Sequence, residues 1–116
     1  MISEIVNYQS AKWLHSKGFN EATLKKYSLA SRELCEITGT IPAPTYAAAF
    51  RWIEINYQLF IDRQTIITNE KIQGFTYWII GQQLNYLVGH FTSQYQACLE
   101  TLELTINFLN HEITTR

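Results

Sequence analysis

The feature that most restricts this chain is a long run without charge, because no Asp, Glu, Lys or Arg occurs from Ile72 to Leu99. Three structures could contain such a run: a membrane-spanning segment, an aromatic platform for a ligand, or core strands beside an uncharged subunit contact. A spanning helix needs about 20 predominantly apolar residues. Here Gln82, Gln83 and Asn85 fall together near the middle of the run. We therefore expect no membrane segment.

The composition is that of one globular domain. The chain has 116 residues, of which 47% are hydrophobic and 16% are charged, a length that accommodates one core. We expect a single domain over residues 1–116. The N-terminus lacks the basic and apolar regions of a signal peptide, and the two cysteines, Cys35 and Cys98, form no CxxC pair. We expect reduced thiols and a cytoplasmic protein.

Three segments have the apolar periodicity of helices. The first covers residues 3–17, with Ser3 as its N-cap and Gly18 as its stop. The second follows Thr45, a candidate N-cap, and the third follows Ser93, which forms a capping box with the residue three positions later. Apolar residues recur at helical spacing in the second segment (Tyr46, Ala49, Phe50, Ile53 and Tyr57) and in the third (Tyr95, Cys98, Leu99, Leu102, Ile106, Leu109 and Ile113).

Between the second and third predicted helices, apolar residues recur at every second position, which is the period of a β-strand. Residues 57–67 and 74–80 are rich in β-branched and aromatic side chains and flank the polar "TNEKIQ", which predicts an antiparallel hairpin. Residues 84–88 are a candidate third strand, and residues 21–38 fit either a helix or two short strands. The chain is therefore expected to be an α+β domain. Its antiparallel sheet would have three to five strands, with two longer helices and one short helix packed mainly on one face.

Both faces of the strand at 74–80 are largely apolar, and this suggests a subunit contact. One face would take the helices. The other, with Trp78 and Ile80, would be a poor surface for solvent but a good one for a protein, since interface cores keep aromatics and exclude charge. We expect a homodimer, and contact with a protein partner that the sequence does not name. The candidate interface residues are Trp78, Ile80, Gln82, Gln83 and Tyr86.

The polar residues do not form a recognisable catalytic or metal-binding pattern. His15, His90 and His111 have no second ligand at metal-site spacing. Cys98 lies on the apolar stripe of the last helix, where burial makes a thiol unreactive. The glycines are single and widely spaced, so no phosphate-binding loop is present. We expect no enzymatic activity, no cofactor and no metal.

An alternative function uses the aromatic residues of the predicted sheet. Phe75, Tyr77, Trp78 and Tyr86 could stack on the bases of a single-stranded nucleic acid. Such platforms also need Lys or Arg for the phosphates, and the charge-free run supplies neither. The formal net charge is −1, and the basic residues are scattered. A weak single-stranded nucleic-acid binder is therefore the alternative, and binding of nucleic acid is disfavoured.

Several residues recur at the ends and starts of the expected elements: Lys17, Gly18, Phe19, Pro42, Thr45, Trp52, Tyr95 and Ala97. With this order of elements, the chain resembles a recurrent type of small protein encoded by phages and prophages, especially those of gut bacteria. The resemblance covers nearly the whole chain, although the type's Tyr-x-x-Ala spacing is one residue shorter here. It implies a fold with strands at residues 21–38 and a phage-related genomic context, and it implies no catalytic residue.

Overall fold

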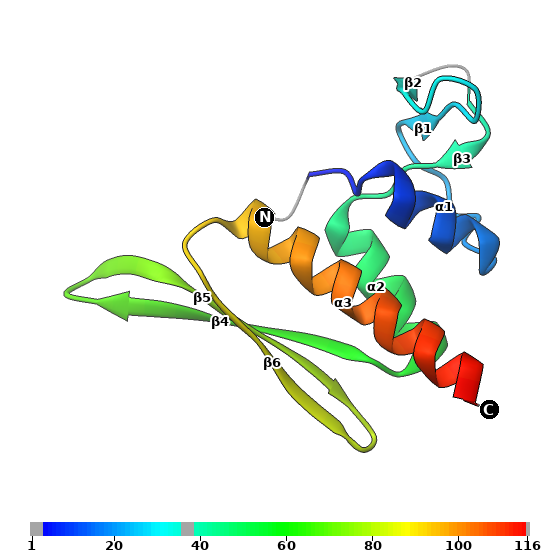
Figure 1. Cartoon of the computed structure of the whole chain (residues 1–116). Helices are drawn as coiled ribbons and strands as arrows, with labels where there is room; N and C mark the ends of the chain where they lie inside the picture. The colour runs from blue at the N-terminus through cyan, green and yellow to red at the C-terminus, as the bar shows by residue number, and fades with distance from the viewer. Residues whose placement is uncertain (1–3, 36–38, 116) are drawn as a thin grey trace. The chain divides into compact units, whose positions relative to one another are not determined.

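The computed structural model describes residues 4–35 and 39–115, without the side chains of 112–115. It confirms the α+β prediction. Within the described residues, six strands form two antiparallel three-stranded sheets, β2–β1–β3 and β4–β5–β6, which adds a small sheet to the one expected. In chain order the elements are α1 (Tyr8–Ser16), β1 (Lys26–Tyr27), β2 (Leu34–Cys35), β3 (Ile41–Pro42), α2 (Tyr46–Tyr57), β4 (Phe60–Thr68), β5 (Lys71–Gly81), β6 (Leu84–Phe91) and α3 (Gln94–Thr115) (Figure 1).

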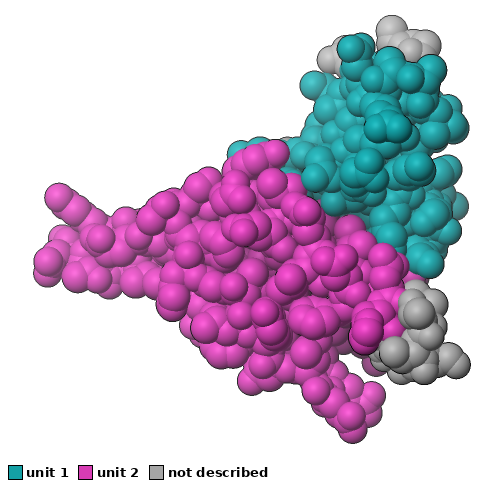
Figure 2. Space-filling model, in the orientation of Figure 1, with its two compact units in different colours: residues 1–52 teal, residues 53–116 magenta. Residues whose placement is uncertain are grey.

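The chain divides into two compact units, residues 1–52 and 53–116 (Figure 2). The division falls inside α2, so this helix contributes residues to both units. Compactness by itself does not establish independent folding. The expectation of a single domain therefore stays a prediction.

In the first unit, α1 begins later than the sequence predicts. Asn7 is its N-cap, and the Asn7 Oδ1 accepts a hydrogen bond of 2.9 Å from the backbone N–H three residues on. Val6, the residue before the cap, is not part of the helix, because its N–H donates to the carbonyl of Pro44 at 3.0 Å. The predicted helix start is wrong because this segment pairs with the approach to α2. Ser3 lies outside the described residues.

The end of α1 confirms the predicted glycine stop. Gly18 has φ +102°, a left-handed conformation that costs a glycine little. The Phe19 N–H donates to the carbonyl of Leu14 at 2.9 Å, the long-range bond of a Schellman motif. The Phe19 side chain is buried, and its ring lies edge-on to that of Trp52 with centroids 5.7 Å apart. The glycine thus lets the chain fold back over the helix end.

The ambiguous segment at 21–38 contains two short strands, β1 and β2, which pair antiparallel. The side chain of Tyr27 in β1 is buried, and its hydroxyl donates to the carbonyl of Val6 at 2.7 Å. The described part of the segment therefore has the strands that the resemblance implied. Residues 36–38 lie outside the described residues.

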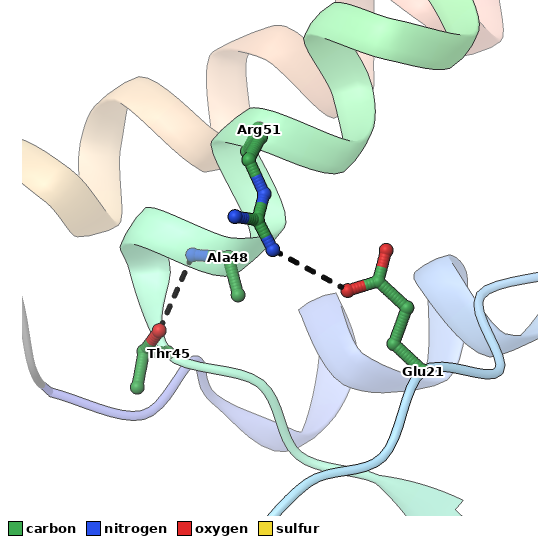
Figure 3. A network of polar contacts seen from close by, with 4 residues as sticks. All are labelled: Glu21, Thr45, Ala48 and Arg51. Carbon is green, nitrogen blue, oxygen red and sulfur yellow. Dashed lines mark hydrogen bonds and ion pairs between the residues drawn. The ribbon is translucent and has the colours of Figure 1, made fainter.

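The beginning of α2 is capped as the sequence predicts. The Thr45 Oγ1 accepts a hydrogen bond of 3.2 Å from the backbone N–H of Ala48 (Figure 3). On the outward side of the helix, the Arg51 guanidinium lies 3.8 Å from the carboxylate of Glu21. Both charged side chains are largely exposed, so this ion pair contributes little to stability.

The second unit contains the larger sheet, whose strands follow one another in sequence order. A two-residue turn, Asn69–Glu70, joins β4 to β5, and φ is positive at both residues (53° and 64°), as in a type I′ hairpin. The hairpin narrows toward this tip and projects from the unit (Figure 2). A second two-residue turn, Gln82–Gln83, joins β5 to β6. The predicted third strand is therefore present, and it extends to Phe91.

The last helix, α3, packs against β5 and β6 (Figure 1). It begins as predicted, since the Ser93 Oγ accepts a hydrogen bond of 3.2 Å from the backbone N–H of Gln96. The core of the second unit joins this helix to one face of the sheet. Within the described residues, no helix is long and apolar enough to cross a membrane. The buried side chains of this core include Tyr77, Ile79, Ala97, Cys98, Leu102 and Leu109.

Candidate interaction surface

The register of the larger sheet assigns each residue to one of two faces, because residues directly opposite in an antiparallel pair point to the same side. On β5, Trp78 lies opposite Asp62 of β4 and Leu87 of β6. The pairs two residues before and after Trp78 on β5 lie on the same side of the sheet as Trp78. We call it the outer face, and its residues are Phe60, Asp62, Gln64, Thr76, Trp78, Ile80, Asn85, Leu87 and His90.

The opposite, inner face carries the packing with α3. The Tyr86 ring lies 5.2 Å from that of Phe108 on the helix. The hydroxyl of Tyr77 lies 3.6 Å from the Cys98 sulfur. Burial, and then the hydrogen bond with Cys98, raise the pKa of Tyr77 well above its ordinary value. Tyr77 and Cys98 therefore belong to a closed core, whereas Tyr86 is 42% exposed.

The outer face exposes a cluster of large apolar side chains. Phe60 is 45% exposed, Leu87 41% and Ile80 36%. Trp78 lies between β4 and β6 on the central strand and is half-buried. One exposed apolar side chain is ordinary, but neighbouring ones on a single face are typical of contact sites.

The predicted interface residues are divided by this register. Trp78 and Ile80 lie on the outer face, as expected, and Gln82 and Gln83 form the exposed turn beside it. Tyr86 lies opposite Ile79 and therefore on the inner face, since one more residue in the turn would have moved it to the other side. Its side chain is 42% exposed, and its place in an interface stays a prediction.

Sequence reasoning missed two members of the apolar cluster, Phe60 and Leu87. Phe60 could have been found by alternation, because it lies two residues before the polar Asp62 on the same strand. Leu87 depends on the two-residue turn, which sets an uninterrupted register from Gly81–Leu84 to Trp78–Leu87. A β-bulge at Val88 follows Leu87 and places His90 on the outer face. Gly89 has φ +153°, which a side chain would strain.

The aromatic residues considered for base stacking do not share one surface. Tyr77 is buried on the inner face. Phe75, on the same side, lies under the Arg63 guanidinium, 5.6 Å from the ring centroid, and Tyr86 lies against α3. Trp78 is on the opposite face. No observation therefore favours a stacking platform over a protein contact.

The histidines lie on three different elements, α1, β6 and α3. His15 is exposed on α1, and His111 is exposed on α3. His90 is on the outer face, with its Nδ1 2.9 Å from the Thr76 Oγ1. In the part of the chain that the structure describes, no three His, Cys, Asp or Glu side chains are grouped so that they could hold a metal ion.

Comparisons with models of protein families, with curated proteins and with solved structures gave no match to this chain.

Proposed function

We propose that this protein is a phage- or prophage-derived accessory or adaptor protein that acts through protein–protein contacts and forms a homodimer through the outer face. The observation that carries the proposal is the cluster of exposed Phe60, Ile80 and Leu87 around the half-buried Trp78. The resemblance of the sequence to small phage-encoded proteins supports the genomic context.

A second copy of the chain fits this surface for two reasons. A closed two-fold contact is the commonest way in which identical subunits associate. Such a contact buries the same patch twice, and charged side chains at its centre would lose their hydration. The strands β5 and β6 contribute no charged side chain between Ile72 and Phe91. The centre of the outer face is therefore suited to burial against itself.

The test is the mass of the protein in solution before and after a charge is placed on this face. We expect the wild-type chain to sediment at about 27 kDa, twice the chain mass of 13.5 kDa. Trp78→Lys should sediment as a monomer and keep its helical circular dichroism, because lysine is tolerated on an exposed strand face but not inside an interface.

Two further variants make the result interpretable. Ile80 is already 36% exposed, so Ile80→Lys should dissociate the dimer even if Trp78→Lys fails to fold. Leu24 is 93% exposed and lies outside the sheet, so Leu24→Lys is a matched control that should remain dimeric. A wild-type chain that is monomeric at high micromolar concentration would overturn the proposed homodimer.

A further inference from the structure

The apolar cluster on the outer face is flanked by two ionisable groups on opposite edge strands. Asp62 lies on β4 opposite Trp78, and His90 lies on β6 opposite Thr76. Both side chains are exposed. A register shift between Ile66 and Ile67 brings a further ionisable side chain, that of Lys71, to this side of the sheet at the far tip of the hairpin, where it pairs with Thr68. The surface therefore carries an acid on one edge and a titratable base on the other.

This charge pattern is complementary to itself under one two-fold arrangement. When the axis runs along β5, between two copies facing each other, β4 of each copy lies over β6 of the other. Asp62 and His90 are then two residues apart along the strand direction, an offset of about 7 Å that their side chains must span. An axis across the strands would instead place each edge over its own copy, and no opposite charges would meet.

We infer that two copies associate through the outer face with β4 over β6, so that Asp62 of each copy pairs with protonated His90 of the other. This inference rests on the proposed homodimer and specifies its geometry. The occupant of the surface is therefore a second copy of this chain, and the apolar cluster lies between two identical ion pairs.

The surroundings of His90 allow both charge states. A threonine hydroxyl can donate to a neutral ring nitrogen or accept from a protonated one. The 2.9 Å contact between the Thr76 Oγ1 and the His90 Nδ1 can therefore persist when the ring gains its proton. On the outer face, the side chain opposite Thr76 on β4 is the neutral Gln64. In this arrangement, the negative charge that interacts with the protonated His90 ring is the carboxylate of Asp62 on the second copy.

The arrangement predicts the direction of a pH effect. Histidine side chains gain their proton between about pH 8 and pH 5, whereas aspartate carboxylates are ordinarily ionised over that range. The ion pair exists only in the dimer, so protonation strengthens association. The dissociation constant of the full-length dimer, measured by sedimentation equilibrium, should be about threefold to tenfold lower at pH 5.5 than at pH 8.

Paired substitutions identify the groups involved. His90→Gln and Asp62→Asn should each abolish the pH response, and His111→Gln, which changes an exposed histidine on α3, should retain it. His90→Asp should weaken the dimer, because it places two carboxylates face to face. Adding Asp62→His to that variant should restore the dimer and its pH response.

Failure of this inference differs from failure of the proposed function. A wild-type chain that is monomeric at both pH values removes the homodimer itself. A dimer whose dissociation constant is unchanged between pH 8 and pH 5.5, or is lower at pH 8, overturns only the β4-over-β6 pairing. A pH response that persists in His90→Gln overturns that pairing as well, because another group would then be responsible.

Discussion

Glu70 has a backbone conformation that its side chain disfavours. It is the second residue of the turn between β4 and β5, with φ 64°. The first residue, Asn69, belongs to a type that enters this region readily, but glutamate does not. The left-handed conformation costs a residue with a side chain about 1–2 kcal/mol, and glycine avoids that cost.

Glu70→Gly should therefore stabilise the hairpin. Glycine also gains freedom in the unfolded chain, so we expect a net increase in the free energy of unfolding of about 0.5–1 kcal/mol, measured by urea denaturation and by hydrogen exchange at Thr68 and Lys71. Glu70→Ala removes the same charge but keeps a side chain, and it should give no such gain. Equal effects of the two substitutions would show that the backbone conformation is not the cause.

Tyr77 shows how a single buried group affects stability at high pH. Burial first, and the hydrogen bond with Cys98 second, raise its pKa above the ordinary value of 10.0. Above about pH 10 the unfolded chain therefore loses this proton while the folded chain keeps it. Stability contributed by the neutral hydroxyl is present below pH 10 and is lost as the pH rises toward the pKa of the folded state.

Tyr77→Phe should consequently lose less stability than the wild type between pH 9 and pH 11, since phenylalanine has no proton to release. The difference in slope should be about 1.4 kcal/mol per pH unit once the unfolded tyrosine is ionised, measured by urea unfolding. Tyr95→Phe changes a tyrosine that is 46% exposed and should behave like the wild type. Parallel curves for Tyr77→Phe and the wild type would contradict this assignment.

At the scale of elements, we expect α3 to be the main support of the second unit. Leu102 on this helix is fully buried, and truncation of such a leucine leaves a cavity. Leu102→Ala should lower the free energy of unfolding by about 2–5 kcal/mol, measured by chemical denaturation. Leu24→Ala, at a leucine that is 93% exposed, should cost less than about 0.5 kcal/mol. A similar small cost at Leu102 would mean that the apolar stripe is not core.

Some element boundaries could be predicted from sequence because they depend on local hydrogen bonds. The hydrogen bonds at Thr45, Ser93 and Gly18 join residues within about one helical turn of each other. The helix ends that they form can therefore be predicted from neighbouring residues in the sequence. The start of α1 was not predictable in this way, since Val6 is held by Pro44, far along the chain. Long-range backbone pairing leaves no local pattern.

The candidate interaction surface was partly predictable for the same reason. Trp78 and Ile80 alternate along one strand, and that period places them on one face without knowledge of the partner strands. Membership of the other strands depends on the register, which a two-residue turn and the bulge at Val88 determine. One more residue in the turn would exchange the faces of Tyr86 and Leu87, and a missing bulge would move His90 to the inner face. Alternation along β5 alone therefore did not identify Leu87.

For the whole molecule, the central question is whether the two compact units unfold together. The division between them falls within α2, which supplies Tyr46 and Ala49 to the first unit and Ile53 to the second. All three side chains are fully buried. A helix that loses one half of its buried stripe would lose packing in the other half, because helix stability in proteins comes largely from tertiary contacts.

We therefore expect one cooperative unfolding transition for the 116-residue chain. Leu14 and Leu102 are fully buried in the first and second units respectively. Leu14→Ala and Leu102→Ala should each move the whole transition to lower denaturant, with circular dichroism and tryptophan fluorescence remaining coincident. If each substitution instead shifted only one of two separate transitions, the units would be independent domains. In a single domain, the packing of either unit supports the other through the unbroken hydrogen bonds of α2.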